Sequence, residues 1–80
     1  MAQQDAPEAA RRIVATLQLA AQEYRLAWVG GSLTKPEEAH EARLFVAEAR
    51  RTARDLPAPL FRDVDARIAD LERLLAASAP

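Results

Sequence analysis

The connection between two helical segments is the stretch of sequence that decides the fold. Residues 28–37 read Trp-Val-Gly-Gly-Ser-Leu-Thr-Lys-Pro-Glu. The two glycines supply the left-handed conformation in which a helix commonly ends. Thr34 and Glu37 have the spacing of a capping box, and Pro36 suits the first turn of the helix that follows. Because the connection is short, the two helices are expected to be antiparallel neighbours.

Apolar residues recur at helical spacing on both sides of this connection. The pattern predicts helices over residues 7–29, 35–56 and 60–77. Pro57 and Pro59 end the second helix, because proline lacks the backbone donor and extends the residue before it. The sequence therefore predicts a single helical domain over residues 1–80, an all-α, antiparallel up-down-up three-helix bundle. Whether two such bundles pair into a dimer stays open.

Length, charge and cysteine content exclude several classes of protein. A chain of 80 residues has room for one compact domain, which buries about 60–65% of the surface of the unfolded chain. The net charge of −1 argues against a nucleic-acid partner, and the chain has no apolar run that spans a membrane. It has no cysteine, and its only histidine is His40, so the residues for nucleophilic catalysis are missing. We therefore expect that the protein is not an enzyme.

The first helix carries a second apolar stripe. Leu19 and Leu26 lie about 180° from Leu17 when the helix is projected at 100° per residue. Two interpretations account for this stripe. In the first, the helix packs against both other helices. In the second, the stripe is a surface for a partner, either a second copy or the rest of a larger protein, and the chain is a non-catalytic interaction module without a metal.

Three glutamates form the best candidate for a chemical site. Projection puts Glu38 within about 20° of Phe45, near the centre of the apolar stripe of the second helix, and Glu41 at its edge. In a hairpin that turns near Ser32, Glu23 lies nine residues before the turn and Glu41 nine after it, so both occupy the same level. Clustered carboxylate oxygens suit iron, manganese or calcium better than a soft metal.

Other charged residues leave alternatives open. Acids are favoured in the first turn of a helix by its dipole, and Arg25 or Lys35 would neutralise them as ordinary ion pairs. Glu37 and His40 have the i, i+3 spacing of di-iron ligands, but both project away from the apolar stripe, so a second chain would have to complete their site. Arg43, Arg50, Arg51 and Arg54 form a basic outer face on the second helix, which we expect to be solvated, with a contact to an anionic group as the alternative.

Residues 23–45 also carry a longer pattern. A Glu23-Tyr24 pair precedes a Gly31-x-Leu33 turn, and Glu38-x-x-Glu41 with a later Phe45 follows it. This segment resembles the periplasmic helical region that precedes the membrane permease in bacterial high-affinity, oxidase-dependent iron permeases. In that family an acid-Tyr pair ends one helix, a Gly-x-Val turn follows, and a Glu-Tyr-x-Glu run opens the next.

The chain departs from the family pattern at two positions. Ala39 stands where the family usually has tyrosine, and Leu44 stands where an acid often precedes the phenylalanine. The membrane helices of the permease, with their Arg-Glu-x-x-Glu motifs, have no counterpart in this sequence. Two polar groups of the family pattern are therefore missing here.

The resemblance implies a periplasmic domain associated with an iron permease, which binds or hands over iron or another divalent cation. Because three acids converge, we expect the metal ligands to be Glu23, Glu38 and Glu41, with His40 completed by a second chain. Tyr24 would donate a hydrogen bond to a ligand. Residues 2–7, Ala-Gln-Gln-Asp-Ala-Pro, suit a mature amino terminus left by a signal peptidase, which would agree with a periplasmic location.

Overall fold

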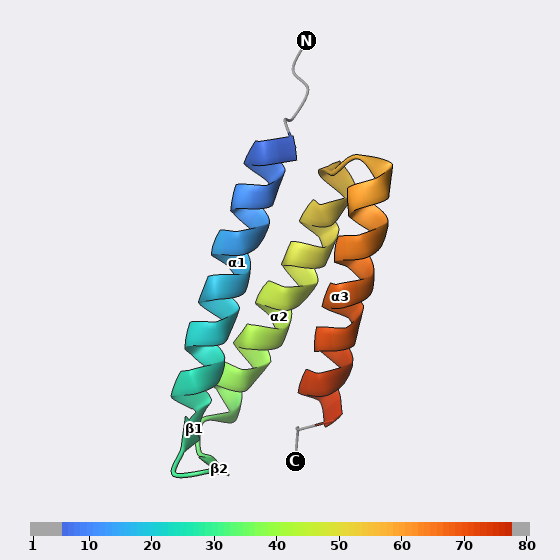
Figure 1. Cartoon of the computed structure of the whole chain (residues 1–80). Helices are drawn as coiled ribbons and strands as arrows, with labels where there is room; N and C mark the ends of the chain where they lie inside the picture. The colour runs from blue at the N-terminus through green and yellow to red at the C-terminus, as the bar shows by residue number, and fades with distance from the viewer. Residues whose placement is uncertain (1–5, 78–80) are drawn as a thin grey trace.

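The computed structural model describes residues 6–77 as three α-helices, a short β-hairpin and a 3-10 turn (Figure 1). The elements are α1 (Ala6–Ala27), β1 (Trp28–Val29), β2 (Ser32–Leu33), α2 (Pro36–Thr52), η1 (Ala53–Asp55) and α3 (Ala58–Ala77). Figure 1 shows α1 and α3 running in one direction and α2 in the other. The predicted all-α, up-down-up bundle is confirmed. The expected processed amino terminus falls largely outside the described residues.

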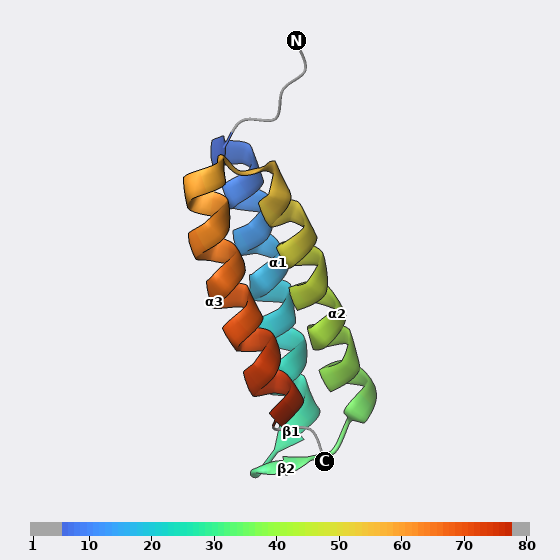
Figure 2. The same ribbon diagram turned by 90° about the vertical axis from the view of Figure 1, so that its right-hand side faces the viewer.

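A two-residue hairpin joins α1 to α2. Trp28 pairs with Leu33 and Val29 with Ser32, and Gly30 and Gly31 take φ angles of 59° and 82° at the turn. Two successive positive φ angles suit the tight hairpin turn whose twist matches the paired strands. The helix therefore ends at Ala27, and the glycines form the hairpin turn instead of ending the helix. Turned by 90°, the molecule shows this hairpin projecting beyond the helix ends (Figure 2).

The predicted capping box at the start of α2 is wrong. Lys35 occupies the N-cap position, and no side chain caps the helix there. Thr34 closes the hairpin instead: its backbone N–H donates to the Ala27 carbonyl at 2.8 Å, and its Oγ1 donates to the same oxygen at 3.4 Å. The hydroxyl that would cap α2 is therefore directed at the end of α1.

Alanines line the contact between α1 and α2, which is the most extensive helix contact in the molecule. The buried alanines are Ala9, Ala20 and Ala27 on α1 and Ala39, Ala42 and Ala49 on α2. Val46 is the largest side chain that is almost fully buried, at 1% exposure. Since the distance between helix axes depends on the side chains at the contact, small residues let α1 and α2 approach closely. Longer side chains at the edge of this contact can then meet.

The third helix packs on α2 and η1 and makes far fewer contacts with α1. Its buried residues are Ile68 and Leu75. Arg50 of α2 fastens the two helices, because its Nε donates to Asp65 at 2.7 Å and one terminal nitrogen donates to Glu72 at 2.8 Å. The prediction that Arg50 belongs to a solvated outer face is therefore wrong. Two acids of α3 hold this arginine between the helices.

The second apolar stripe of α1 is on the surface. Leu19 and Leu26 are 46% and 49% exposed, so the interpretation that α1 packs against the other helices on this side is wrong. Over residues 6–77, the helices are too short or too polar to cross a membrane.

Candidate metal centre

Glu23, Glu38 and Glu41 come together at the hairpin end of the molecule. Each offers one carboxylate oxygen, and these oxygens lie within 4.8 Å of one another. Glu23 belongs to the last turns of α1, and Glu38 and Glu41 belong to the first turns of α2. The short hairpin sets their common level, and the alanine contact brings the two helices close enough for the carboxylates to meet. Their convergence was predicted from the sequence, and their role as ligands stays a prediction.

The three carboxylates differ in burial and interact electrically. Glu23 and Glu38 are half-buried, whereas Glu41 is exposed. A hydrogen bond with Glu38, followed by burial and by the negative charges of Glu38 and Glu41, raises the pKa of Glu23 above the ordinary glutamate range. Glu23 therefore resists ionisation beside the other two carboxylates, and a bound cation would relieve the repulsion that it feels.

The alternative in which these acids form ordinary ion pairs is not observed. Within residues 6–77, Arg50, Arg67 and Arg73 form ion pairs with acids of α3 and not with the three glutamates. Neither Arg25 nor Lys35 pairs with the three glutamates in this part of the chain. The negative charge of the cluster is therefore not neutralised by a neighbouring base of the described chain.

His40 is not part of the cluster. It is exposed, and it follows Ala39, which is buried against α1, by one residue, a rotation of about 100° around the helix. Within one copy of the chain, therefore, the structure leaves His40 apart from the three glutamates. Its predicted role, with a ligand set completed by a second chain, stays a prediction.

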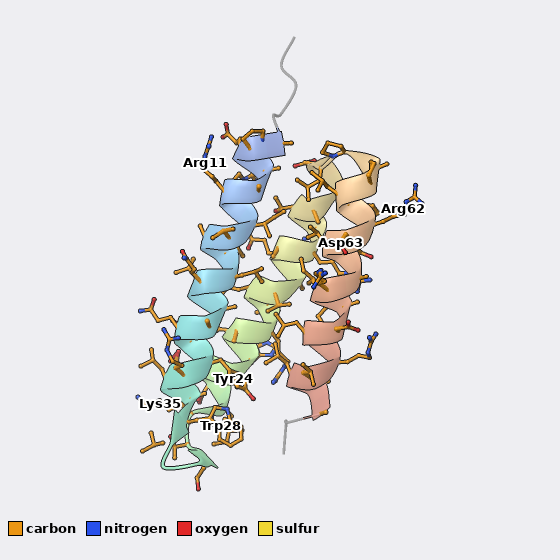
Figure 3. All side chains as sticks on the ribbon, in the orientation of Figure 1. Arg11, Tyr24, Trp28, Lys35, Arg62 and Asp63 are labelled. Carbon is orange, nitrogen blue, oxygen red and sulfur yellow. The ribbon has the colours of Figure 1, made fainter. Side chains whose placement is uncertain are left out.

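Tyr24 follows Glu23 by one residue, a rotation of about 100° around α1. Its ring packs against Trp28, with ring centroids 6.0 Å apart and an interplanar angle of 54°. The two aromatic side chains are labelled at the hairpin end in Figure 3. Tyr24 also lines a groove between α1 and α3, together with Leu71 and Leu75. Its predicted hydrogen bond with a metal ligand stays a prediction.

That groove is a feature that the sequence did not predict. It has a volume of about 310 Å³ and is mostly apolar. Leu17 and Tyr24 of α1 form one wall, Leu71 and Leu75 of α3 form the other, and Val46 of α2 lies beneath them. The groove depends on which side of α3 faces α2, and the periodicity of a single helix does not determine that.

Comparison with known proteins places the chain in a family. No curated protein and no solved structure is detectably similar to it. A family model described as an iron permease-associated 4-helix bundle domain matches residues 2–80. This match confirms the resemblance seen in residues 23–45 and extends it over nearly the whole chain. The protein therefore belongs to the family of iron permease-associated four-helix bundle domains.

Proposed function

We propose that this domain binds iron, or another divalent cation that prefers oxygen ligands, through Glu23, Glu38 and Glu41. The observation that carries the proposal is the meeting of three carboxylates from two helices within 4.8 Å. Membership of a family associated with iron permeases supports iron as the cation. The proposed setting is the periplasm, beside a membrane permease, and the proposed role is non-catalytic.

The arrangement of the three acids suits exchange of the cation more than permanent storage. Glu41 is exposed, so the cation would reach the cluster directly from solvent and keep water among its ligands. Glu23 has a raised pKa, so a proton competes with the cation for this carboxylate. Both features favour a site that takes up a cation and gives it up again to a neighbouring protein.

Titration calorimetry of the purified domain tests this function. Ferrous iron without oxygen, ferric iron held soluble by a weak chelator, manganese and calcium would be compared. We expect binding tighter than about 1 mM, and at least tenfold weaker binding by the isosteric double variant Glu38→Gln, Glu41→Gln. The matched control is Glu8→Gln, Glu37→Gln, which removes the same charge from acids outside the cluster. Absence of binding, or equal weakening by the control, would overturn the proposal.

The exposed leucines of α1 support a second candidate function. Leu19 and Leu26 stand about two helical turns apart on one face, and each is nearly half exposed. Such a pair favours a non-catalytic interaction module that docks a protein partner through α1. Light scattering of the Leu19→Asp, Leu26→Asp variant tests whether this face joins two copies. A mass unchanged by the substitutions would remove self-association from the roles of the face.

A further inference from the structure

The groove between α1 and α3 marks an open corner of a bundle. The second helix packs against both neighbours, whereas α1 and α3 make few contacts with each other. The three helices therefore occupy three corners of a square arrangement, with α2 diagonally opposite the groove. The family is described as a four-helix bundle, and residues 6–77 supply three long helices. A fourth helix in the groove would run antiparallel to both α1 and α3, as in an up-down-up-down bundle.

The third helix itself carries a stripe that fits such a position. Five residues follow one another at spacings of four, three, four and three: Leu60, Val64, Arg67, Leu71 and Leu74. This is the spacing of a helix–helix seam. Leu60 and Leu74 are 50% and 67% exposed, and Val64 and Leu71 are half-buried. Ile68 and Leu75 of the neighbouring stripe are buried, and Val64 and Leu71 pack partly against the same core, so Leu60 and Leu74 are the apolar members of the second stripe that lie on the surface.

We propose that a second copy of the chain docks its α3 antiparallel to this α3, so that each copy fills the open groove of the other. The symmetry of the stripe argues for a second copy as the occupant. Leu60 and Leu74 each lie seven residues from Arg67. A two-fold axis at Arg67 therefore places Leu60 of each copy opposite Leu74 of the other copy. The partner's α3 then runs antiparallel to α1 and α3, which is the direction of the fourth helix in an up-down-up-down bundle.

The charges near the axis suit this pairing. Arg67 lies 3.4 Å from Asp63, one turn before it, and Asp70 pairs with Arg73 on the following turn. Each copy therefore brings both acids and bases to the centre of the stripe. The two copies of Arg67 meet with Asp63 already beside each of them, which reduces the repulsion between the two arginines.

Disulfide cross-linking tests the direction and the register in which the α3 helices of two copies pair. The chain has no cysteine of its own, so introduced cysteines report only the intended contact. Residues 60 and 74 of one helix are about 21 Å apart, whereas a disulfide joins Cα atoms about 4.4–6.8 Å apart. Leu60→Cys and Leu74→Cys proteins, mixed and mildly oxidised, should form the mixed dimer in large excess over either symmetric one. Arg67→Cys should cross-link to itself.

Sedimentation equilibrium tests the association without cysteines. The unmodified domain should dimerise below about 1 mM, and Leu60→Glu, Leu74→Glu should raise the dimer dissociation constant at least tenfold. The matched control, Val29→Glu, Leu44→Glu, alters exposed apolar side chains of the hairpin and α2, away from the groove, and should leave the constant within about threefold. Circular dichroism checks that all variants keep their helices. A monomer up to about 1 mM, preferential Leu60–Leu60 cross-links, or a control variant that alone dissociates would each overturn the proposal.

Discussion

Carboxylate oxygens of Glu23 in α1 and Glu38 in α2 lie within 4.8 Å of each other across the boundary between the two helices, and hydrogen bonding with Glu38 is the first cause of the raised pKa of Glu23. Ionised carboxylates only accept hydrogen bonds, so one of the two must carry a proton for the bond to form. The cluster proposed to bind a cation therefore holds a proton in the metal-free protein over part of the pH range.

Cation binding should release that proton. In calorimetry near the raised pKa of Glu23, the observed heat should depend on the ionisation enthalpy of the buffer, because the released proton passes to the buffer. At higher pH, where Glu23 is already ionised, this dependence should disappear. Glu23→Gln should remove it at every pH. Tight binding with the same heat in all buffers at acid pH would contradict the shared proton.

The stability of the protein should respond to the same group. The folded protein binds the Glu23 proton more tightly than the unfolded chain does, so this group lowers stability as the pH rises from the ordinary glutamate range through the raised pKa. Glu23→Gln should therefore be more stable than the parent protein at about pH 7, and this gain should vanish near pH 3.5. Urea unfolding at the two pH values measures it. Glu37→Gln is the control. An equal gain in the free energy of unfolding for this variant would contradict the assignment of the effect to Glu23.

Arg50 should make the attachment of α3 sensitive to acid. Hydrogen bonding to Arg50 lowers the pKa of Asp65, so this carboxylate adds stability above the ordinary aspartate range, and that stability is lost as the pH falls through the lowered pKa. Arg50→Met should reduce the thermal midpoint at pH 7 and have a much smaller effect near pH 2. Arg51→Met, on an exposed arginine, should change little at either pH.

Val46 should be the most sensitive apolar position on α2. It is 1% exposed beneath the groove and against the alanines of α1. Val46→Ala removes two methyl groups and leaves a cavity, so we expect a loss of about 2 kcal/mol in the free energy of unfolding. Val14→Ala makes the same change at a side chain that is 54% exposed, and it should cost less than about 0.5 kcal/mol. Similar losses for both variants would contradict the burial assigned to Val46.

The hairpin should tolerate asparagine better than alanine. Gly30 and Gly31 have φ angles of 59° and 82°, a region in which a side chain costs about 1–2 kcal/mol per residue. Gly30→Ala should lower the free energy of unfolding by about that amount, and Gly30→Asn should lose clearly less, because asparagine accepts such turns. A Cβ at either position has open space, so an equal loss for both variants would point away from backbone conformation as the cause.

Helical periodicity predicts the three helices, but it does not predict how their ends are used. The first helix stops at Ala27 because Trp28 and Val29 pair across the hairpin, and a pairing of two residues leaves no periodic signal. Thr34 has the sequence position of a helix cap, but its hydroxyl donates to the Ala27 carbonyl, and helical periodicity does not reveal that contact. A local sequence pattern shows which hydrogen bonds a residue is able to make. Here Thr34 bonds to the Ala27 carbonyl of the first helix instead of capping the second.

The candidate site was predictable to a greater extent than the α2–α3 contact. Counting residues from a short turn is enough to place Glu23 and Glu41 at one level, because the hairpin fixes the register of α1 against α2. The partners of Arg50 depend on the rotation of α3 about its axis and on its height along α2. The 3-10 turn between α2 and α3 contains no paired strands that would fix either quantity, so the sequence pattern alone left Arg50 on the surface.

The contact between Tyr24 and Trp28 gives the protein a built-in optical probe. The chain has one tryptophan and one tyrosine, and their rings lie 6.0 Å apart beside the hairpin. Indole fluorescence and the tryptophan bands of the aromatic circular dichroism therefore report on this end of the molecule, while far-ultraviolet dichroism reports on all three helices. If the indole signal changes at a lower temperature than the far-ultraviolet signal, the hairpin end opens before the rest of the bundle, and local fraying can be followed without any label.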